Sequence, residues 1–293
     1  MDRFNFLVVG GAGFIGSSMV DFLIGADHDV TIIDNLSTGK ISNVNRLAKF
    51  LEIDITKDEF SFEGFDYVIH MAATPNVQQS IDNPILSNSN NFQTTLKIIE
   101  GCKNTSVKKI IFSSTSAIYG DSKYFPTREK SDENPMSPYA LDKLMSEKYL
   151  KLYSELYGIK SVCLRYFNVF GERMTSEGAY KSVISVFKGQ KEKNIALTIT
   201  NDGSQRRDFV YVGDVVYANY LSCINETGDF NLYNVGFGEN ISVNEIASYF
   251  NQPTSYIGKR VEPFQTLCDN TKIVSELGWN PTISVKDWIS DKK

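Results

Sequence analysis

The opening of the chain constrains its fold most strongly, because an apolar run breaks into glycines and then resumes with helical spacing. Residues 6–9 are apolar, which predicts a strand that is buried on both faces. After the glycines, apolar side chains recur with the period of a helix at Ile15, Met19, Phe22 and Leu23. Residues 4–23 therefore predict a strand, a tight turn and a helix in direct succession.

The glycines of this turn have the spacing of a dinucleotide-binding loop. Gly10 would allow the tight turn, Gly13 would let a pyrophosphate approach the backbone, and Gly16 would let the helix pack closely on the strand. The N-terminus of the helix would then hold the phosphate charge. The turn therefore predicts a site for a dinucleotide.

A second strand supports this interpretation. Residues 30–33 are apolar and end in Asp34, about twenty residues past the glycines, where a carboxylate can accept both ribose hydroxyls of an adenosine. Because Asp34 would repel a 2′-phosphate, the pattern predicts NAD rather than NADP as the cofactor. The alternative is a glycine-rich hairpin followed by an incidental acidic turn residue.

Strands and helices alternate through the first half of the chain. Further strands are predicted at residues 50–53, 65–71, 109–112 and 161–167, and helices at 84–102 and from Pro138 onward, with Ser137 as the N-cap. This alternation predicts an α/β fold, a Rossmann-type doubly wound parallel sheet with ligands at the carboxyl ends of its strands. The composition changes beyond Asn168. We therefore expect an NAD-binding domain at 1–167, to which roughly 207–235 return, and a smaller C-terminal α/β substrate-binding lobe over most of 168–293.

The bulk composition excludes several classes of protein. A net charge of −5 and a pI near 5.3 argue against a nucleic-acid partner. The four cysteines lie far apart and the chain has two histidines, which leaves little material for a zinc site or a histidine-based triad, so no metal is expected. The cysteines are interpreted as buried thiols in a reducing compartment. With no leader or membrane segment predicted, we expect a cytoplasmic protein that binds a small molecule.

A tyrosine and a lysine are candidates for the chemistry. Tyr139 and Lys143 are four residues apart on a predicted helix, so their side chains share a face. A nearby ammonium favours the phenolate and lowers a pKa that starts near 10, which would make Tyr139 a general base. A hydroxyl from Thr115, or from the neighbouring Ser114, could hold the substrate oxygen that is deprotonated. The alternative is a packed tyrosine, a lysine extended along the surface and a polar strand end.

Several motifs extend this pattern along almost the whole chain. They are Gly10–Gly16, Asp34–Gly39, His70–Ala73, Ser113–Gly120, Ser137–Lys143, Leu164–Gly171 and Arg207–Tyr211. Together they resemble the motifs of extended short-chain dehydrogenase/reductases, specifically the nucleotide-sugar epimerases of the UDP-glucose 4-epimerase type. The resemblance implies that Tyr139 takes the proton of the 4-hydroxyl, that the C4 hydride passes to NAD and returns to the other face of a 4-keto sugar, and that no net redox occurs.

The resemblance also implies a set of binding residues. NAD would contact Gly10, Gly13, Phe14, Ile15, Gly16, Asp34, Asn35, Ser37, Thr38, Gly39, Asp54, Ile55, Met71, Ala72, Ala73, Asn90, Ser113, Tyr139, Lys143 and Tyr166. A UDP-sugar would contact Thr115, Asn168, Tyr180, Val183, Arg207, Arg260 and Thr266. Arg207 and Arg260 would clamp the diphosphate, and Asn168 would donate to a phosphate oxygen. By the same analogy, the helices at roughly 84–102 and 138–157 would form a homodimer through a four-helix bundle.

Departures from the family pattern separate its members. Dehydratases and decarboxylases carry a carboxyl group just after the catalytic threonine, where this chain has Ser116 and Ala117, so C4 epimerisation is favoured. The small Thr266 would leave room for an acetamido group, which favours UDP-N-acetylglucosamine/UDP-N-acetylgalactosamine over UDP-glucose/UDP-galactose. Gln93–Thr95 lacks a glycine that relatives carry, for which we expect only a local change in helix packing. A UDP-glucuronate epimerase, a reductase, a dehydratase and a non-catalytic NAD-sensing regulator remain as alternatives.

Overall fold

The computed structural model describes residues 2–175, 181–258 and 263–291. Within them, seven strands form one sheet in the order β10-β6-β5-β4-β1-β2-β3, and every neighbouring pair is parallel. The strands are β1 (Asn5–Val9), β2 (Asp29–Asp34), β3 (Lys49–Glu52), β4 (Tyr67–His70), β5 (Lys109–Thr115), β6 (Ser161–Tyr166) and β10 (Phe230–Val235). The predicted Rossmann-type doubly wound parallel sheet is confirmed.

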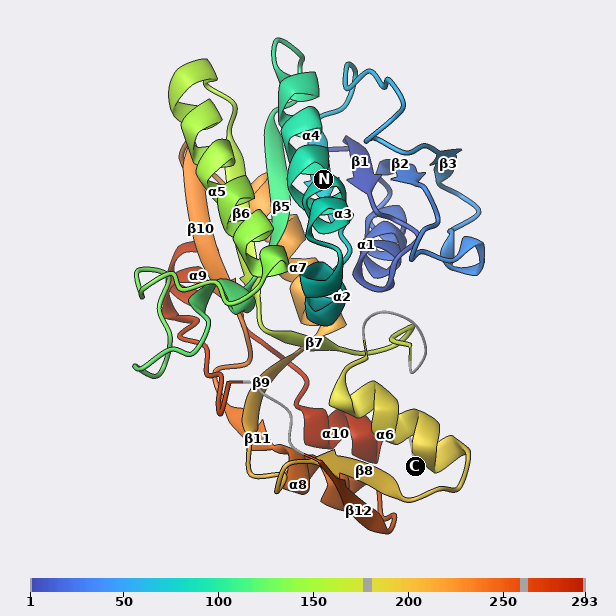
Figure 1. Ribbon diagram of the computed structural model, residues 1–293. Coiled ribbons are helices and arrows are strands. Elements are labelled where there is room, and N and C mark those ends of the chain that lie inside the picture. Colours follow the sequence, from blue (N-terminus) through green and yellow to red (C-terminus); the bar gives the residue numbers. More distant parts are fainter. Residues whose placement is uncertain (1, 176–180, 259–262, 292–293) are drawn as a thin grey trace.

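Helices cover both faces of this sheet, because successive side chains of a buried parallel strand point to opposite faces. On one face Phe6 and Val8 of β1 pack with α1 (Phe14–Gly25) and α7 (Val212–Ile224). On the other face Leu7 and Val9 pack with α4 (Thr94–Cys102) and α5 (Pro138–Tyr157). Figure 1 shows α4 and α5 in front of the sheet. In the part of the chain that the structure describes, no helix combines the length and apolar character needed to cross a membrane.

Helix α5 begins and ends as its sequence predicts. The Ser137 side chain accepts a hydrogen bond from the backbone N–H of Ala140 at 3.2 Å, and Pro138 occupies the first turn. The helix stops at Gly158, which has a φ of 69° and so takes the left-handed conformation that glycine adopts most easily. These local signals fix the length of the helix that carries Tyr139 and Lys143.

The predicted helix at 84–102 is confirmed in its bounds, but it contains a wider turn. After the short α2 (Val77–Asp82), the chain forms α3 (Pro84–Asn88), a π-helical turn η2 (Ser89–Gln93) and then α4. The Thr94 hydroxyl donates to the Ser89 backbone oxygen, five residues earlier, at 3.2 Å. The wider turn ends at Gln93, where the segment that lacks the family's glycine begins, and such turns are frequent at functional sites.

The later part of the chain builds two smaller sheets, in the orders β11-β9-β7 and β12-β8, which lie below the main sheet in Figure 1. They comprise β7 (Asn168–Phe170), β8 (Leu197–Thr200), β9 (Arg206–Tyr211), β11 (Asn240–Ser242) and β12 (Thr254–Ile257). The remaining helices are α6 (Val183–Glu192), α8 (Val243–Tyr249), α9 (Thr271–Leu277) and α10 (Val285–Ser290), with short 3-10 turns η1 (Ile41–Asn43) and η3 (Ser116–Tyr119). A separate apolar core that includes Phe170, Phe187 and Trp288 holds this part together.

Candidate active site

Of the three glycines of the dinucleotide-binding pattern, Gly10 in the loop between β1 and α1 and Gly16 in α1 leave no room for a side chain. Gly10 has a φ of +87°, and a Cβ there would lie 2.5 Å from the backbone nitrogen of Ala72. A Cβ on Gly16 would collide with the Gly10 backbone oxygen. At Gly13, the N-cap of α1, a Cβ would meet only the Gly10 oxygen, at 3.3 Å. The loop therefore leaves its open side at the start of α1, where phosphate binding is favourable.

Asp34 is tied to this loop at the end of β2. One carboxylate oxygen accepts the backbone N–H of Ala12 at 3.0 Å and the other accepts that of Leu36 at 2.8 Å. Burial raises the pKa of Asp34, and these two N–H groups oppose the increase only in part. A Cβ on Gly39 would lie 2.9 Å from the Asp34 Oδ1 atom, so the turn after β2 closes tightly on the carboxylate. Glycine loop and acid form one cradle, which fits the phosphates and a ribose of NAD.

The other predicted NAD residues of this region line the same edge of the sheet. The Asn35 side chain accepts the backbone N–H of Ser37 at 3.1 Å, and so shapes the turn that continues through Thr38. Past β3, burial alone would raise the pKa of Asp54, but hydrogen bonds from Lys57 and Thr56 lower it to about 2. The remaining positions are Phe14 and Ile15 in the first turn of α1, the buried Ile55 beside Asp54, and Met71, Ala72 and Ala73 after β4.

The turn η2 holds the segment that follows β4. Asn90 Nδ2 donates to the Thr74 hydroxyl at 3.2 Å, and Asn91 Oδ1 accepts the Thr74 backbone N–H at 2.9 Å. Asn91 is fully buried and also donates to the Ser87 hydroxyl at 3.2 Å. The prediction of Asn90 as an NAD contact stays a prediction, and the sequence did not indicate that its neighbour Asn91 is the one that the π-helical turn buries.

Lys143 joins helix α5 to the end of β5. Its Nζ donates to the Ser113 backbone oxygen at 2.8 Å and lies 4.5 Å from the centroid of the Phe112 ring. Tyr139, one turn earlier on the same face, is 9% exposed and Lys143 is 1% exposed. Burial lowers the pKa of Lys143 to about 7, although the carboxylates of Glu147 and Asp142 act in the opposite direction.

The hydroxyl groups at the end of β5 have different partners. Ser113 Oγ lies 3.0 Å from the Tyr166 hydroxyl, which also contacts the Asn219 amide. Ser114 Oγ donates to Glu147 Oε1. Thr115 Oγ1 accepts the Ala117 backbone N–H at 3.1 Å and so caps η3. Of the two hydroxyls proposed for substrate, Ser114 is committed to a buried carboxylate, and this favours Thr115.

A buried ion pair lies next to Ser114 at the end of β5. Arg165 of β6, 0% exposed, donates from Nε and Nη2 to the two oxygens of Glu147, at 3.0 and 2.6 Å. Arg165 also donates to Glu133 at 2.8 Å. Glu147 was missed in the sequence, although it stands one turn beyond Lys143 on the same helix face and that spacing could have identified it.

Three of the predicted substrate residues meet between β7, β9 and the segment 263–268. Asn168 Nδ2 donates to the Asp208 backbone oxygen at 2.8 Å and to Thr266 Oγ1 at 3.4 Å. Arg207 Nη1 donates to the backbone oxygens of Arg206, at 2.9 Å, and Phe264, at 3.2 Å. Val183 begins α6 and packs against the core of the smaller sheets. Tyr180 and Arg260 lie outside the described residues.

Asp208 is a further residue that sequence reasoning missed. Its fully buried carboxylate accepts the backbone N–H groups of Phe237 at 2.7 Å and of Gly238 and Cys268 at 3.0 Å. Burial raises the pKa of Asp208 to about 7 against the effect of these hydrogen bonds. The carboxylate therefore fastens the segment that carries Thr266 to β9 and to the loop after β10.

Comparison with known proteins agrees with this geometry. The model of the NAD-dependent epimerase/dehydratase family matches residues 6–236. A putative UDP-glucose 4-epimerase of Methanocaldococcus jannaschii is 41% identical over 97% of this chain and 95% of its own length. The crystal structure of the UDP-glucose 4-epimerase of Thermotoga maritima with UDP-glucose has a TM-score of 0.93 at 38% identity, over 97% of this chain and 96% of that one. The UDP-N-acetylglucosamine 4-epimerase of Methanobrevibacter ruminantium, in complex with UDP-N-acetylmuramic acid, has a TM-score of 0.92 at 34% identity over the full length of both chains. Matches of this length show that the chain belongs to the NAD-dependent epimerase/dehydratase family, as an enzyme with NAD as its cofactor.

Proposed function

We propose that the protein interconverts the C4 epimers of a UDP-hexose. The observation that carries the proposal is the contact between Lys143 Nζ and the Ser113 backbone oxygen, because it holds the Tyr139 face of α5 against the strand end that presents Thr115. The glycine cradle and Asp34 lie at the same edge of the sheet. Base, hydroxyl and cofactor cradle can thus converge on one sugar carbon.

In this mechanism Tyr139 removes the proton of the C4 hydroxyl, and the Thr115 hydroxyl holds the same oxygen. NAD, when bound, supplies the hydride acceptor and later the hydride donor. In its protonated form, Lys143 stabilises the phenolate form of Tyr139. The 4-keto sugar then rotates and presents its other face. Tyr139 returns the proton, so the enzyme ends each cycle in its starting state.

The proposed binding residues divide between the two parts of the chain. Residues 1–167, with roughly 207–235, form the NAD-binding domain, and most of 168–293 forms the sugar-nucleotide lobe. Arg207 and Arg260 clamp the diphosphate with bidentate charge-assisted hydrogen bonds. Asn168 donates to a phosphate oxygen once it exchanges its present partners, and Tyr180 and Val183 line the base and sugar.

For the sugar, we propose UDP-N-acetylglucosamine/UDP-N-acetylgalactosamine ahead of UDP-glucose/UDP-galactose. The Thr266 side chain is small, and its hydroxyl is engaged by the Asp208 backbone N–H at 3.2 Å, so it presents no bulk to an acetamido group. The likeness to a UDP-N-acetylglucosamine 4-epimerase is compatible with this choice, and the likeness to UDP-glucose 4-epimerases keeps UDP-glucose/UDP-galactose as the second candidate.

One experiment tests activity and substrate together. The purified protein is incubated with a panel of UDP-hexoses and UDP-glucuronate, the products are identified by NMR, and NADH release is followed by absorbance. We expect C4 epimers without stoichiometric NADH. Release of NADH would identify a dehydrogenase or reductase, and no product from any sugar would favour an NAD-sensing regulator.

We also propose a homodimer formed by two helical segments from each chain. Exposed apolar side chains follow one face of α5 at Leu141, Met145, Leu152 and Leu156, and Ile85 of α3 is 87% exposed. Spacings of four and seven residues form the stripe that helices bury against one another. Sedimentation at micromolar concentration should give the mass of a dimer, and Leu152→Glu should shift it toward the monomer.

A further inference from the structure

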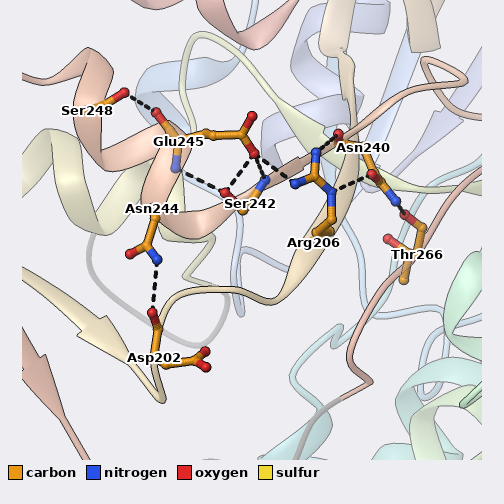
Figure 2. A network of polar contacts seen from close by, with 8 residues as sticks. All are labelled: Asp202, Arg206, Asn240, Ser242, Asn244, Glu245, Ser248 and Thr266. Carbon is orange, nitrogen blue, oxygen red and sulfur yellow. Dashed lines mark hydrogen bonds and ion pairs between the residues drawn. The ribbon is translucent and has the colours of Figure 1, made fainter.

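Each of the three guanidinium nitrogens of Arg206, next to the proposed diphosphate ligand Arg207, donates to an acceptor within the protein (Figure 2). Nε donates to Asn240 Oδ1 and Nη2 to the Asn240 backbone oxygen, both at 2.8 Å, and Nη1 donates to Glu245 Oε2 at 2.9 Å. Adjacent residues of a strand point to opposite faces, so the two arginines have different surroundings. We call Arg206, Asn240 and Glu245 the Arg206 anchor.

Glu245 is itself held in place. Its Oε2 atom also accepts the Ser242 backbone N–H at 2.9 Å and the Ser242 hydroxyl at 2.7 Å, which completes the capping box of α8. The Ser242 hydrogen bonds lower the pKa of Glu245, and Arg206 adds to the effect. The anchor therefore rests on the N-terminus of a helix and keeps its charge paired.

The other side of the anchor reaches the segment 264–266. Asn240 Nδ2 donates to the Thr266 backbone oxygen at 3.3 Å, the Arg206 N–H donates to the Phe264 oxygen at 2.9 Å, and the Thr266 N–H donates to the Arg206 oxygen at 3.1 Å. The carbonyl oxygens of Arg206 and Phe264 are the ones that receive Arg207 Nη1. The anchor therefore contacts Thr266 directly through Asn240 and the Arg206 backbone. It contacts Arg207 through the Arg206 backbone oxygen.

We infer that Arg206 is a positioning residue, which acts through Asn240 and Glu245 to hold Arg207 and Thr266 in the geometry that binds the UDP-sugar. The inference rests on the proposed function, because it uses the substrate roles of those two residues. The Arg206 and Glu245 side chains are 36% and 50% exposed, and ion pairs of that exposure contribute little to folding stability. Loss of the anchor should therefore alter substrate affinity more than it alters stability.

An opposing view is that Arg206 is itself a diphosphate ligand, and Glu245→Gln separates the two. Glutamine keeps an oxygen for Ser242 but removes the charge that pairs with Arg206. If Arg206 bound phosphate, the released cation would tighten UDP binding. If Arg206 is an anchor, the same substitution loosens the segment 264–266 and weakens UDP binding.

The test compares Arg206→Ala, Glu245→Gln and the control Lys188→Ala, which breaks an exposed ion pair with Glu192 elsewhere in the same lobe. The readouts are KM and kcat for the UDP-sugar that the wild type converts, the Kd of UDP by calorimetry, and hydrogen exchange of the peptide that contains residues 264–268. We expect Arg206→Ala to raise KM and the Kd of UDP about tenfold and Glu245→Gln about threefold, with kcat within about twofold of the wild type. Exchange of the peptide should accelerate in both variants and not in the control.

The outcomes separate failure of the inference from failure of the proposed function. A wild type that neither binds UDP nor converts a UDP-sugar rejects the function, whereas unchanged hydrogen exchange in Arg206→Ala rejects the anchor on its own. Tighter UDP binding by Glu245→Gln, or a lower melting temperature with wild-type KM, would also overturn the inference. If Arg206→Ala does not fold, the Kd of UDP and the hydrogen exchange measured for Glu245→Gln decide whether Arg206 is an anchor.

Discussion

The ammonium of Lys143 donates a 2.8 Å hydrogen bond to the backbone oxygen of Ser113. This contact crosses from the second turn of α5 to the end of β5, and both partners are buried. It fixes the separation between the helix face that carries Tyr139 and the strand end that carries Thr115.

Tyr139→Phe should slow turnover by orders of magnitude while the protein keeps its NAD. The substitution removes only the hydroxyl, so the packing of the ring is kept, and general base catalysis is worth about 10²- to 10⁴-fold in rate. We expect kcat to fall by that amount with unchanged NAD content after purification. Tyr149→Phe, on the same helix but packed against Phe92, is the matched control and should retain wild-type kcat. Activity near wild type in Tyr139→Phe would reject Tyr139 as the base.

Thr115→Val and Ser114→Ala should have different consequences. Valine keeps the shape of threonine but lacks the hydroxyl that we assign to the substrate, so kcat should drop about a hundredfold, and Thr115→Ser should restore most of it. Ser114→Ala removes the donor to Glu147, which should cost about 1–3 kcal/mol of unfolding free energy with kcat little changed. Steady-state kinetics and urea unfolding measure both effects. The reverse pattern would make Ser114 the substrate hydroxyl.

The sequence predicted those parts of the molecule that depend on neighbouring residues. The turn at Gly10, the packing at Gly16 and the start of α5 at Ser137 follow from local chemistry, and the structure has all of them. The π-helical turn at Ser89–Gln93 does not, because a wider turn is selected by the packing of the whole helical segment. It also decides that Asn91, rather than Asn90, is buried.

Long-range polar contacts were the other part that the sequence could not supply. Asp208 accepts N–H groups from residues 29, 30 and 60 positions away, and no local pattern indicates such partners. Glu147 differs, since its helical spacing from Lys143 was visible. Its partner Arg165 lies on β6, whereas Glu147 lies on α5, so only the fold reveals the pair.

Asp34→Ala should release NAD. The side chain would no longer accept ribose hydroxyls, and the N–H of Ala12 in the glycine loop would lose its acceptor. Hydrogen bonds to a charged group are worth about 1.5–3 kcal/mol, which corresponds to roughly a 10- to 100-fold loss of affinity. Asp29→Ala is the control, because Asp29 lies at the exposed start of the same strand in an ion pair with Arg3. Full NAD occupancy in purified Asp34→Ala would contradict the ribose role.

Arg165→Met should be strongly destabilising, whereas a paired replacement should not. Removal of the arginine leaves the Glu147 carboxylate buried without its bidentate partner, which costs about 3–5 kcal/mol. Arg165→Met combined with Glu147→Leu replaces both charges with apolar groups and should recover most of that loss. Urea unfolding of the two variants gives the comparison. Equal destabilisation by the single and double changes would show that packing, not the unpaired charge, is responsible.

The buried Lys143 should leave a signature in the pH dependence of stability. Its pKa falls from 10.5 in the unfolded chain to about 7 in the folded protein, so between these values the unfolded chain holds a proton that the native protein does not. The Lys143 contribution to the unfolding free energy is therefore fully present above pH 10.5 and is lost as the pH falls toward 7. The loss is no more than about 1.4 kcal/mol per pH unit. Lys143→Met lacks this proton, so the stability of the wild type relative to the variant should increase as the pH rises from 7 to 10.5. Urea unfolding at several pH values, at matched NAD content, measures the difference.

Lys151→Met, which removes an exposed lysine of the same helix, should follow the wild type instead. Parallel curves for wild type and Lys143→Met would mean that Lys143 keeps its proton in the folded protein, and the ammonium would then be fully charged beside Tyr139 throughout this range.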